Sequence, residues 1–272
     1  MGRVVAITSG KGGVGKTTSA AALATGLAQS GARTIAIDLD IGLRNLDLAM
    51  GFEGRIVHDL LGVVNDKVPL ASAVLCDPDN QDLHCLAAPQ TQSKDKLTRQ
   101  TMIELIDMLR EEYDWVVIDT PAGIEPSTTH ALEQSDDAIV VLNPELASIR
   151  DADRVLGLIG ELADDQERHG RHPTQEHLLL TRYAPRLVWA QEQIGYRDVS
   201  EHLHIPVLGV IPESPNILRA TNRGHSVIQT DNRASTAYQN TVARLQGQQR
   251  PLVVPERTKP NLIQRLAARY DP

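Results

Sequence analysis

The chain has 272 residues, with 27 basic and 35 acidic side chains that give a formal net charge of −8. Hydrophobic residues make up 41% and charged residues 23%, a globular composition that excludes a disordered or fibrous chain. The length suits one large domain or two small ones, and the net acidity argues against binding nucleic acid through overall charge.

Aliphatic runs alternate with helical patterns along the chain, an order typical of an α/β fold with a three-layer, doubly wound, mostly parallel sheet. The predicted strands cover residues 4–7, 34–37, 84–86, 115–118, 138–142, 177–180 and 207–211. The predicted helices cover residues 17–29, 99–112, 148–163 and 234–246. We expect one domain over 1–247, a proline-containing linker over 248–260 and a short amphipathic helix over 261–272.

Cysteine content and hydropathy bear on the cellular compartment. Only two cysteines occur, Cys76 and Cys85, too few for a disulfide framework or a closed metal site. No stretch reaches the roughly 18 apolar residues that a membrane span needs, and the first residues do not form a signal peptide. We therefore expect a cytoplasmic protein with reduced thiols.

A glycine-rich loop joins the first predicted strand to the first predicted helix. It matches the pattern G-x-x-x-x-G-K-[ST], which is specific in this context. Glycines let successive backbone N–H groups turn toward phosphate oxygens, while a lysine faces the β and γ phosphates and a hydroxyl can bind Mg²⁺. The pattern predicts a P-loop nucleoside triphosphatase whose phosphate-binding residues are Gly10, Lys11, Gly12, Gly13, Val14, Gly15, Lys16, Thr17 and Thr18.

Three aspartates follow predicted strands whose carboxyl ends face the ligand crevice of such a fold. Asp119 follows the strand 115–118, and Asp38 and Asp40 follow the strand 34–37. We expect Thr17, Asp38 and Asp119 at the Mg²⁺ site and Asp40 beside the attacking water. The alternative is that these carboxylates are turn formers or helix caps.

Lys11 is an extra cation that an ordinary P-loop does not require at its second position. A flexible lysine there can point away from its own nucleotide and supply transition-state charge to a neighbouring subunit, as an arginine finger does. The alternative is a solvated loop lysine.

The loop residues 11–18, with Lys11 as the signature lysine, resemble the deviant Walker ATPases of the ParA/MinD family. Within that family the resemblance is to the septum-site-determining branch, and it covers residues 1–247. The segments that carry it are 38–47, 119–125, 143–145, 150–154, 177–183 and 209–213.

The resemblance implies an ATPase that converts ATP and water to ADP and phosphate with Mg²⁺ and forms a homodimer around ATP. It implies a MinC-like division inhibitor as a recruited partner and a MinE-like activator of hydrolysis. Septum positioning in the cell cycle would take place on an anionic membrane surface, to which the cytoplasmic ATPase binds peripherally, on the inner face, when it holds ATP.

Individual residue roles also follow from the resemblance. Lys11 and Lys16 would contact phosphates and Asp40 would position water, which makes these three the catalytic residues. Residues expected to flank adenine are Thr181, Arg182, Ile211, Pro212 and Glu213. Residues expected to face partner proteins are Arg44, Asn45, Asp151 and Asp153.

The predicted helix at the C-terminus has the pattern of an interfacial helix. Asn261 can cap it, and its apolar residues fall within an arc of about 100° beside two arginines. We expect the membrane contact from Leu262, Ile263, Arg265, Leu266 and Arg269. The alternative is a terminal helix docked on the protein's own surface.

Two other functions share the same ATPase core. A ParA-like ATPase for DNA or cargo positioning would need a basic surface near the C-terminal helices, and residues 201–247 carry arginines offset by acidic residues. An iron–sulfur carrier would need cysteines after strand ends or a C-x-x-C pair, whereas eight residues separate Cys76 from Cys85.

Overall fold

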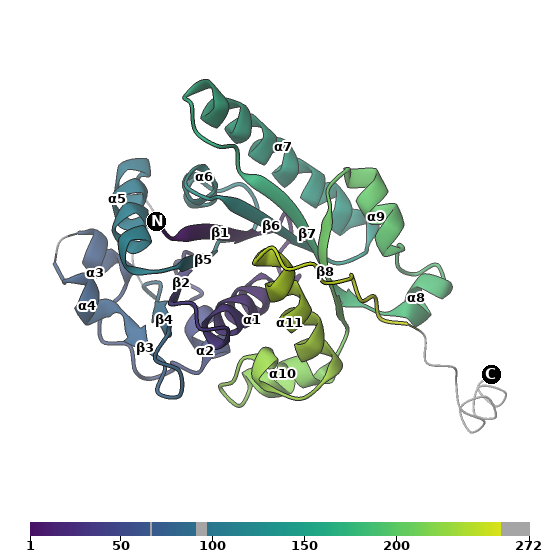
Figure 1. The fold of residues 1–272 in the computed structure, drawn as a ribbon, viewed down its shortest axis with the longest axis horizontal. Helices are drawn as coiled ribbons and strands as arrows, with labels where there is room; N and C mark the ends of the chain where they lie inside the picture. Colours follow the sequence, from purple (N-terminus) through teal and green to yellow (C-terminus); the bar gives the residue numbers. More distant parts are fainter. Residues whose placement is uncertain (66, 91–96, 257–272) are drawn as a thin grey trace.

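We describe a computed structural model of the chain over residues 1–65, 67–90 and 97–256. Within these residues, eight strands form one sheet in the order β3-β4-β2-β5-β1-β6-β7-β8 (Figure 1). The strands are β1 (Arg3–Thr8), β2 (Thr34–Asp38), β3 (Leu75–Cys76), β4 (Leu83–Leu86), β5 (Trp115–Asp119), β6 (Asp137–Leu142), β7 (Gln175–Tyr183) and β8 (Val207–Pro212).

The sheet confirms the predicted doubly wound fold. Every neighbouring pair is parallel except β3 and β4, which run antiparallel at one edge. All seven predicted strands are present. Sequence analysis missed β3, because its two residues are too short to show a periodic pattern.

Helices connect the strands and cover both faces of the sheet. They are α1 (Lys16–Gln29), α2 (Leu46–Met50), α3 (Leu60–Val64), α4 (Leu70–Ala73), α5 (Arg99–Glu112), α6 (Pro126–Glu133), α7 (Leu146–Arg168), α8 (Pro185–Trp189), α9 (Tyr196–Leu203), α10 (Pro215–Thr221), the short 3-10 helix η2 (Val227–Gln229) and α11 (Arg233–Leu245). The predicted helix 99–112 coincides with α5, and the other three long helices are found with ends shifted by a few residues. The shorter helices were not predicted, because one or two turns give little helical periodicity.

Side chains of the central strands alternate between two layers. Val5 and Ile7 of β1 pack in the core beneath α1 and α11, whereas Val4 and Ala6 face the layer of α5, α6 and α7 (Figure 1). Helix α1 is rich in small residues because it lies between the sheet and α11. A Cβ added at Gly26 would come within 2.6 Å of Ile228 Cδ1.

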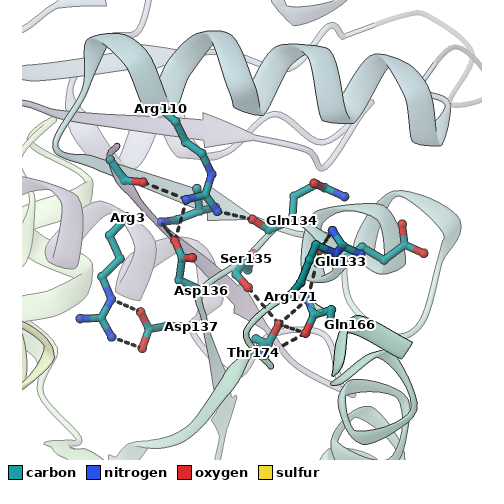
Figure 2. Close-up of polar contacts among 12 residues, drawn as sticks. Arg3, Arg110, Glu133, Gln134, Ser135, Asp136, Asp137, Gln166, Arg171 and Thr174 are labelled. Atoms are coloured by element: carbon teal, nitrogen blue, oxygen red, sulfur yellow. Dashed lines mark hydrogen bonds and ion pairs between the residues drawn. The ribbon is translucent and has the colours of Figure 1, made fainter. Parts of the chain in front are cut away.

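Polar side chains join the amino ends of β1 and β6 to neighbouring segments (Figure 2). Arg3 Nε and Nη2 donate to the buried Asp137 carboxylate at 2.6 and 2.9 Å. Arg110 of α5 donates to the Gln134 carbonyl oxygen at 2.7 Å and pairs with Asp136 at 3.0 Å. These bonds fasten β1, β6 and α5 together, so the carboxyl ends of the strands emerge at fixed positions around the loop.

The chain beyond α11 returns along the sheet edge. Residues 250–256 form no helix or strand, yet Leu252 and Val254 pack against the core. The predicted membrane residues Leu262, Ile263, Arg265, Leu266 and Arg269 lie outside the described residues. Among the described helices, none is long and apolar enough to cross a membrane.

Candidate functional site

The glycine-rich loop occupies the turn between β1 and α1, at the carboxyl edge of the central strand. Gly13 and Gly15 adopt φ values of 77° and 98°, a left-handed conformation that favours glycine. Gly15 directly precedes the first residue of α1, so the N–H groups at this helix end face the loop. The geometry suits an anion such as a phosphate.

Contacts from distant parts of the chain hold the loop in place. The buried Thr181 hydroxyl lies 2.6 Å from the Val14 carbonyl oxygen and 2.9 Å from Asn143 Oδ1. Gly10 packs directly on α7, where an added Cβ would overlap the Asp151 carbonyl oxygen. Sequence analysis did not identify Asn143 as a loop support, because nothing in the sequence indicates that the ends of β6 and β7 meet beneath the loop.

Lys16 lies below the loop with only 9% of its surface exposed. Burial lowers the pKa of its ammonium group, and the carboxylates of Asp119 and Asp40 oppose that shift. The structure therefore brings together the lysine and two of the strand-end carboxylates predicted to act with it. A buried ammonium beside the N–H groups at the start of α1 provides a strong point charge for an anionic ligand.

Asp38 and Asp119 lie side by side, because β2 and β5 pair with these two residues in register. Burial raises the pKa of Asp119 to about 8, and the Asp38 carboxylate adds to the shift, whereas Thr17 and Lys16 oppose it. Burial likewise raises the pKa of Asp38 to about 6, against hydrogen bonds from the N–H groups of Asp40 and Leu46.

The predicted Mg²⁺ site can be tested against these contacts. Asp119 Oδ1 is buried without a hydrogen-bond partner, so a cation beside it would satisfy this oxygen. Asp38 instead accepts the N–H groups of Asp40 at 2.8 Å and Leu46 at 3.2 Å, which holds the following loop. No cluster of three His, Cys, Asp or Glu side chains able to hold a metal occurs in residues 1–65, 67–90 and 97–256. The unpartnered Asp119 oxygen and the Thr17 hydroxyl, which hydrogen-bonds to Asp119, are oxygen donors of the kind that Mg²⁺ prefers, so these two residues fit the ion.

The segment after β2 carries several predicted site residues. Asp40 is half-buried, and its carbonyl oxygen accepts the N–H groups of Leu43 and Arg44. Arg44 pairs with the buried Asp47 at 3.1 Å, while Asn45 is exposed just before α2. The ion pair restrains the Arg44 guanidinium, and the hydrogen bonds at Asp40 hold the backbone of this segment in a turn.

Lys11 extends from the loop toward the start of α7. Its ammonium group lies 3.6 Å from Glu145, and 44% of the side chain is exposed. Asp151 and Asp153 lie further along the same helix, with Asp151 against the loop and Asp153 exposed. An exposed ion pair of this kind contributes little stability, so Lys11 can exchange Glu145 for another anion at small cost.

A cavity of about 1310 Å³ opens beside the loop, between the carboxyl ends of β7 and β8. Four residues predicted to touch the nucleotide line it, namely Thr18, Arg182, Pro212 and Glu213. The other two predicted adenine neighbours, Thr181 and Ile211, are buried and do not belong to its lining. The Thr181 hydroxyl contacts the glycine-rich loop at the Val14 carbonyl oxygen.

Gln193 supports this cavity and was missed by sequence analysis. Arg182 adopts φ 51°, an uncommon conformation for a residue with a side chain. Gln193 Nε2 donates to the Arg182 carbonyl oxygen, and Gln193 Oε1 accepts the Ala184 N–H, each at 2.9 Å. The two bonds fix the strained turn that lines the cavity. A glutamine eleven residues away along the chain gives no local sign of this role.

The raised pKa of Asp119 predicts a pH dependence of stability in the nucleotide-free protein. Between its usual value of 3.8 and about 8, the folded state keeps a proton that the unfolded state has lost. The free energy of unfolding therefore falls as pH rises through this window, by up to about 1.4 kcal/mol per pH unit for this group. Between pH 5.5 and 7.5, the free energy of unfolding measured by urea denaturation should fall less for Asp119→Asn than for the unchanged chain. Equal slopes would show that Asp119 is already ionised.

A glycine-rich loop at the N-terminus of α1, beside carboxylates that end β2 and β5, is the arrangement of a P-loop nucleotide-binding protein. Residues 5–227 match the family described as the CobQ/CobB/MinD/ParA nucleotide binding domain. The chain belongs to this family and, within it, to the septum site-determining MinD proteins.

Individual relatives align over nearly the whole chain. The chain is 46% identical over 268 residues to the septum site-determining protein MinD of Escherichia coli (strain K12), covering 98% of this chain and 99% of that protein. Its fold is similar to the MinC:MinD cell division protein complex of Aquifex aeolicus, with TM-score 0.77, 35% identity, and coverage of 93% of this chain and 98% of that one. It is also similar to MinD of Pyrococcus horikoshii OT3 complexed with Mg-ADP, with TM-score 0.77, 26% identity, and coverage of 90% and 96%.

Proposed function

We propose that the chain is an ATPase that dimerises around ATP and positions the division septum. It recruits a MinC-like division inhibitor to an anionic membrane surface and leaves that surface when a MinE-like activator stimulates hydrolysis. Support comes from its membership of the MinD proteins, from a relative complexed with Mg-ADP and from a relative in a MinC:MinD complex.

The site residues divide the chemistry between them. Lys16 and the N–H groups of the loop bind the β and γ phosphates, and the half-buried Asp40 holds a water in line with the γ-phosphate. Thr17 and Asp119 would hold Mg²⁺, which when bound neutralises phosphate charge. The cavity lined by Arg182, Pro212 and Glu213 takes the adenosine part.

The observation that carries the proposed dimer is a group of exposed apolar side chains around the phosphate loop. Leu43, Ile124 and Leu146 are 67%, 61% and 65% exposed. They follow the carboxyl ends of β2, β5 and β6, the edge at which the loop lies. Such side chains are covered when two copies meet face to face across their nucleotides. In that arrangement Lys11 exchanges Glu145 for the phosphates of the partner subunit.

Partner proteins would dock beside this face. The exposed Asn45 and Asp153, with Arg44 and Asp151 near them in the chain, offer polar contacts to a division inhibitor or an activator. Their segments follow β2 and begin α7, both next to the phosphate loop. Dimerisation would therefore change the surface on which the partners act.

Co-sedimentation with anionic liposomes tests nucleotide-dependent membrane binding. We expect the full chain to sediment with ATP but little with ADP, because two tails in a dimer bind with a gain in effective concentration over one. Binding should fall with salt, since Arg265 and Arg269 would each contribute about 1 kcal/mol at the surface.

The matched control is the chain without residues 261–272, which should still bind ATP but stay in the supernatant. Equal sedimentation of the two chains would show that the tail is not the anchor. Equal sedimentation in ADP and ATP would show that dimerisation does not govern membrane binding.

A further inference from the structure

A segment that follows the last helix lies along the outer strand of the sheet. We call residues 250–256 the strap. Leu252 and Val254 are half-buried against a core cluster that contains Tyr183 and Val210, whereas Val253 between them is 55% exposed. The alternation shows that one side of the strap is packed on the domain. Because β8 is the last strand of the sheet, the strap packs beside an edge strand.

Arg244 fastens the start of the strap. Its Nε donates to the Leu208 carbonyl oxygen of β8 at 2.6 Å, and its Nη1 donates to the Pro251 carbonyl oxygen at 3.0 Å. One guanidinium on α11 therefore joins the edge strand to the strap. The two hydrogen bonds of Arg244 therefore fix the position of Pro251, near the beginning of the strap.

The other end of the strap reaches the cavity between the carboxyl ends of β7 and β8, which we call the nucleoside cavity. Pro255 and Glu256 line the 1310 Å³ cavity together with Thr18, Arg182 and Pro212. A second cavity of about 570 Å³ lies under the strap and shares Pro212 with the first. A nucleoside in the larger cavity would therefore contact a wall built partly from the strap.

We propose that the strap is a mobile wall of the nucleoside cavity, so that nucleotide binding and docking of the strap favour each other. The inference rests on the proposed nucleotide binding and adds an element to that site. A ligand that contacts the strap only when the strap is docked must stabilise the docked state. Docking of the strap must then strengthen binding of the ligand by the same factor. The Glu256 carboxylate at the strap end accepts hydrogen bonds, which suits the exocyclic amino group or ribose hydroxyls of a nucleoside.

Thiol labelling can measure the docking of the strap. We would place Val254→Cys in a chain that also carries Cys76→Ser, because Cys85 is fully buried and Cys76 is not. Mg-ADP is the ligand, since it fills the cavity without the γ-phosphate that dimerisation needs. We expect at least threefold slower labelling at position 254 with Mg-ADP. Val253→Cys, on the exposed side, is the matched control and should label at the same rate with and without the ligand.

Two shortened chains provide a second measurement. The chain ending at Glu256 keeps the strap and should bind ADP like the full chain. The chain ending at Gln249 lacks the strap and should bind ADP about fivefold more weakly in calorimetry, at the lower end of typical coupling. Circular dichroism checks that both are folded.

Unchanged labelling at position 254, in a chain that binds Mg-ADP, would overturn the inference. Equal ADP affinities of the two folded shortened chains would do the same. Absence of ADP binding to the full chain would instead contradict the proposed function, so the two failures are distinguishable.

Discussion

Lys16→Ala should bind ADP and ATP at least about a hundredfold more weakly than the unchanged chain. Lys16 is buried beside Asp119, and in the proposed function its ammonium is the charge that faces the phosphates. Removing one partner of a buried charge contact costs about 3 kcal/mol or more, which corresponds to this factor. Isothermal titration calorimetry at fixed salt measures the change.

The control for Lys16 separates lost charge from lost packing. Lys16→Met keeps an unbranched side chain of similar length without the ammonium, so it should lose nucleotide binding while its folded structure remains. Both variants should show the circular dichroism spectrum of the unchanged chain. Normal nucleotide affinity in folded Lys16→Met would exclude the loop as the phosphate site.

Lys11→Ala should keep nucleotide affinity but lose ATP-dependent dimerisation and nearly all hydrolysis. Lys11 contacts Glu145 rather than the interior of its own loop, and its ion pair is half-exposed. A charge supplied across a subunit interface to transferring phosphate is worth about 10³-fold or more in kcat. Light scattering reports the dimer, and phosphate release reports hydrolysis.

Asp40→Ala provides the contrast for Lys11. If Asp40 holds the attacking water, this variant should dimerise with ATP and hydrolyse poorly, so that a long-lived dimer accumulates. Lys11→Ala should fail at the earlier step. A normal ATP dimer in Lys11→Ala would show that Lys11 is a solvated loop lysine. Normal turnover in Asp40→Ala would show that Asp40 only forms the turn.

Features that depend on neighbouring residues could be predicted from the sequence. The loop between Gly10 and Thr17 is a continuous motif, and its glycines, lysine and hydroxyl are the groups that phosphate binding needs. Aliphatic runs predicted the seven longer strands, because strands of a sheet covered on both faces are apolar throughout. Asp38 and Asp119 could be expected near one another, because parallel strands end at the same edge.

Features that depend on distant residues were decided by the tertiary structure alone. The packed fold buries Asp38 and Asp119, which raises the pKa of each, and the register of β2 with β5 places the Asp38 carboxylate where it raises the pKa of Asp119 further. The sequence contains neither the burial nor the register. Gln193 fixes the turn at Arg182 across eleven residues, and the strap reaches the cavity from beyond α11. The sequence determined the chemistry of the phosphate loop because that chemistry is local. The walls of the nucleoside cavity come from segments that meet only when the sheet and its covering helices are packed, so their composition follows from the fold.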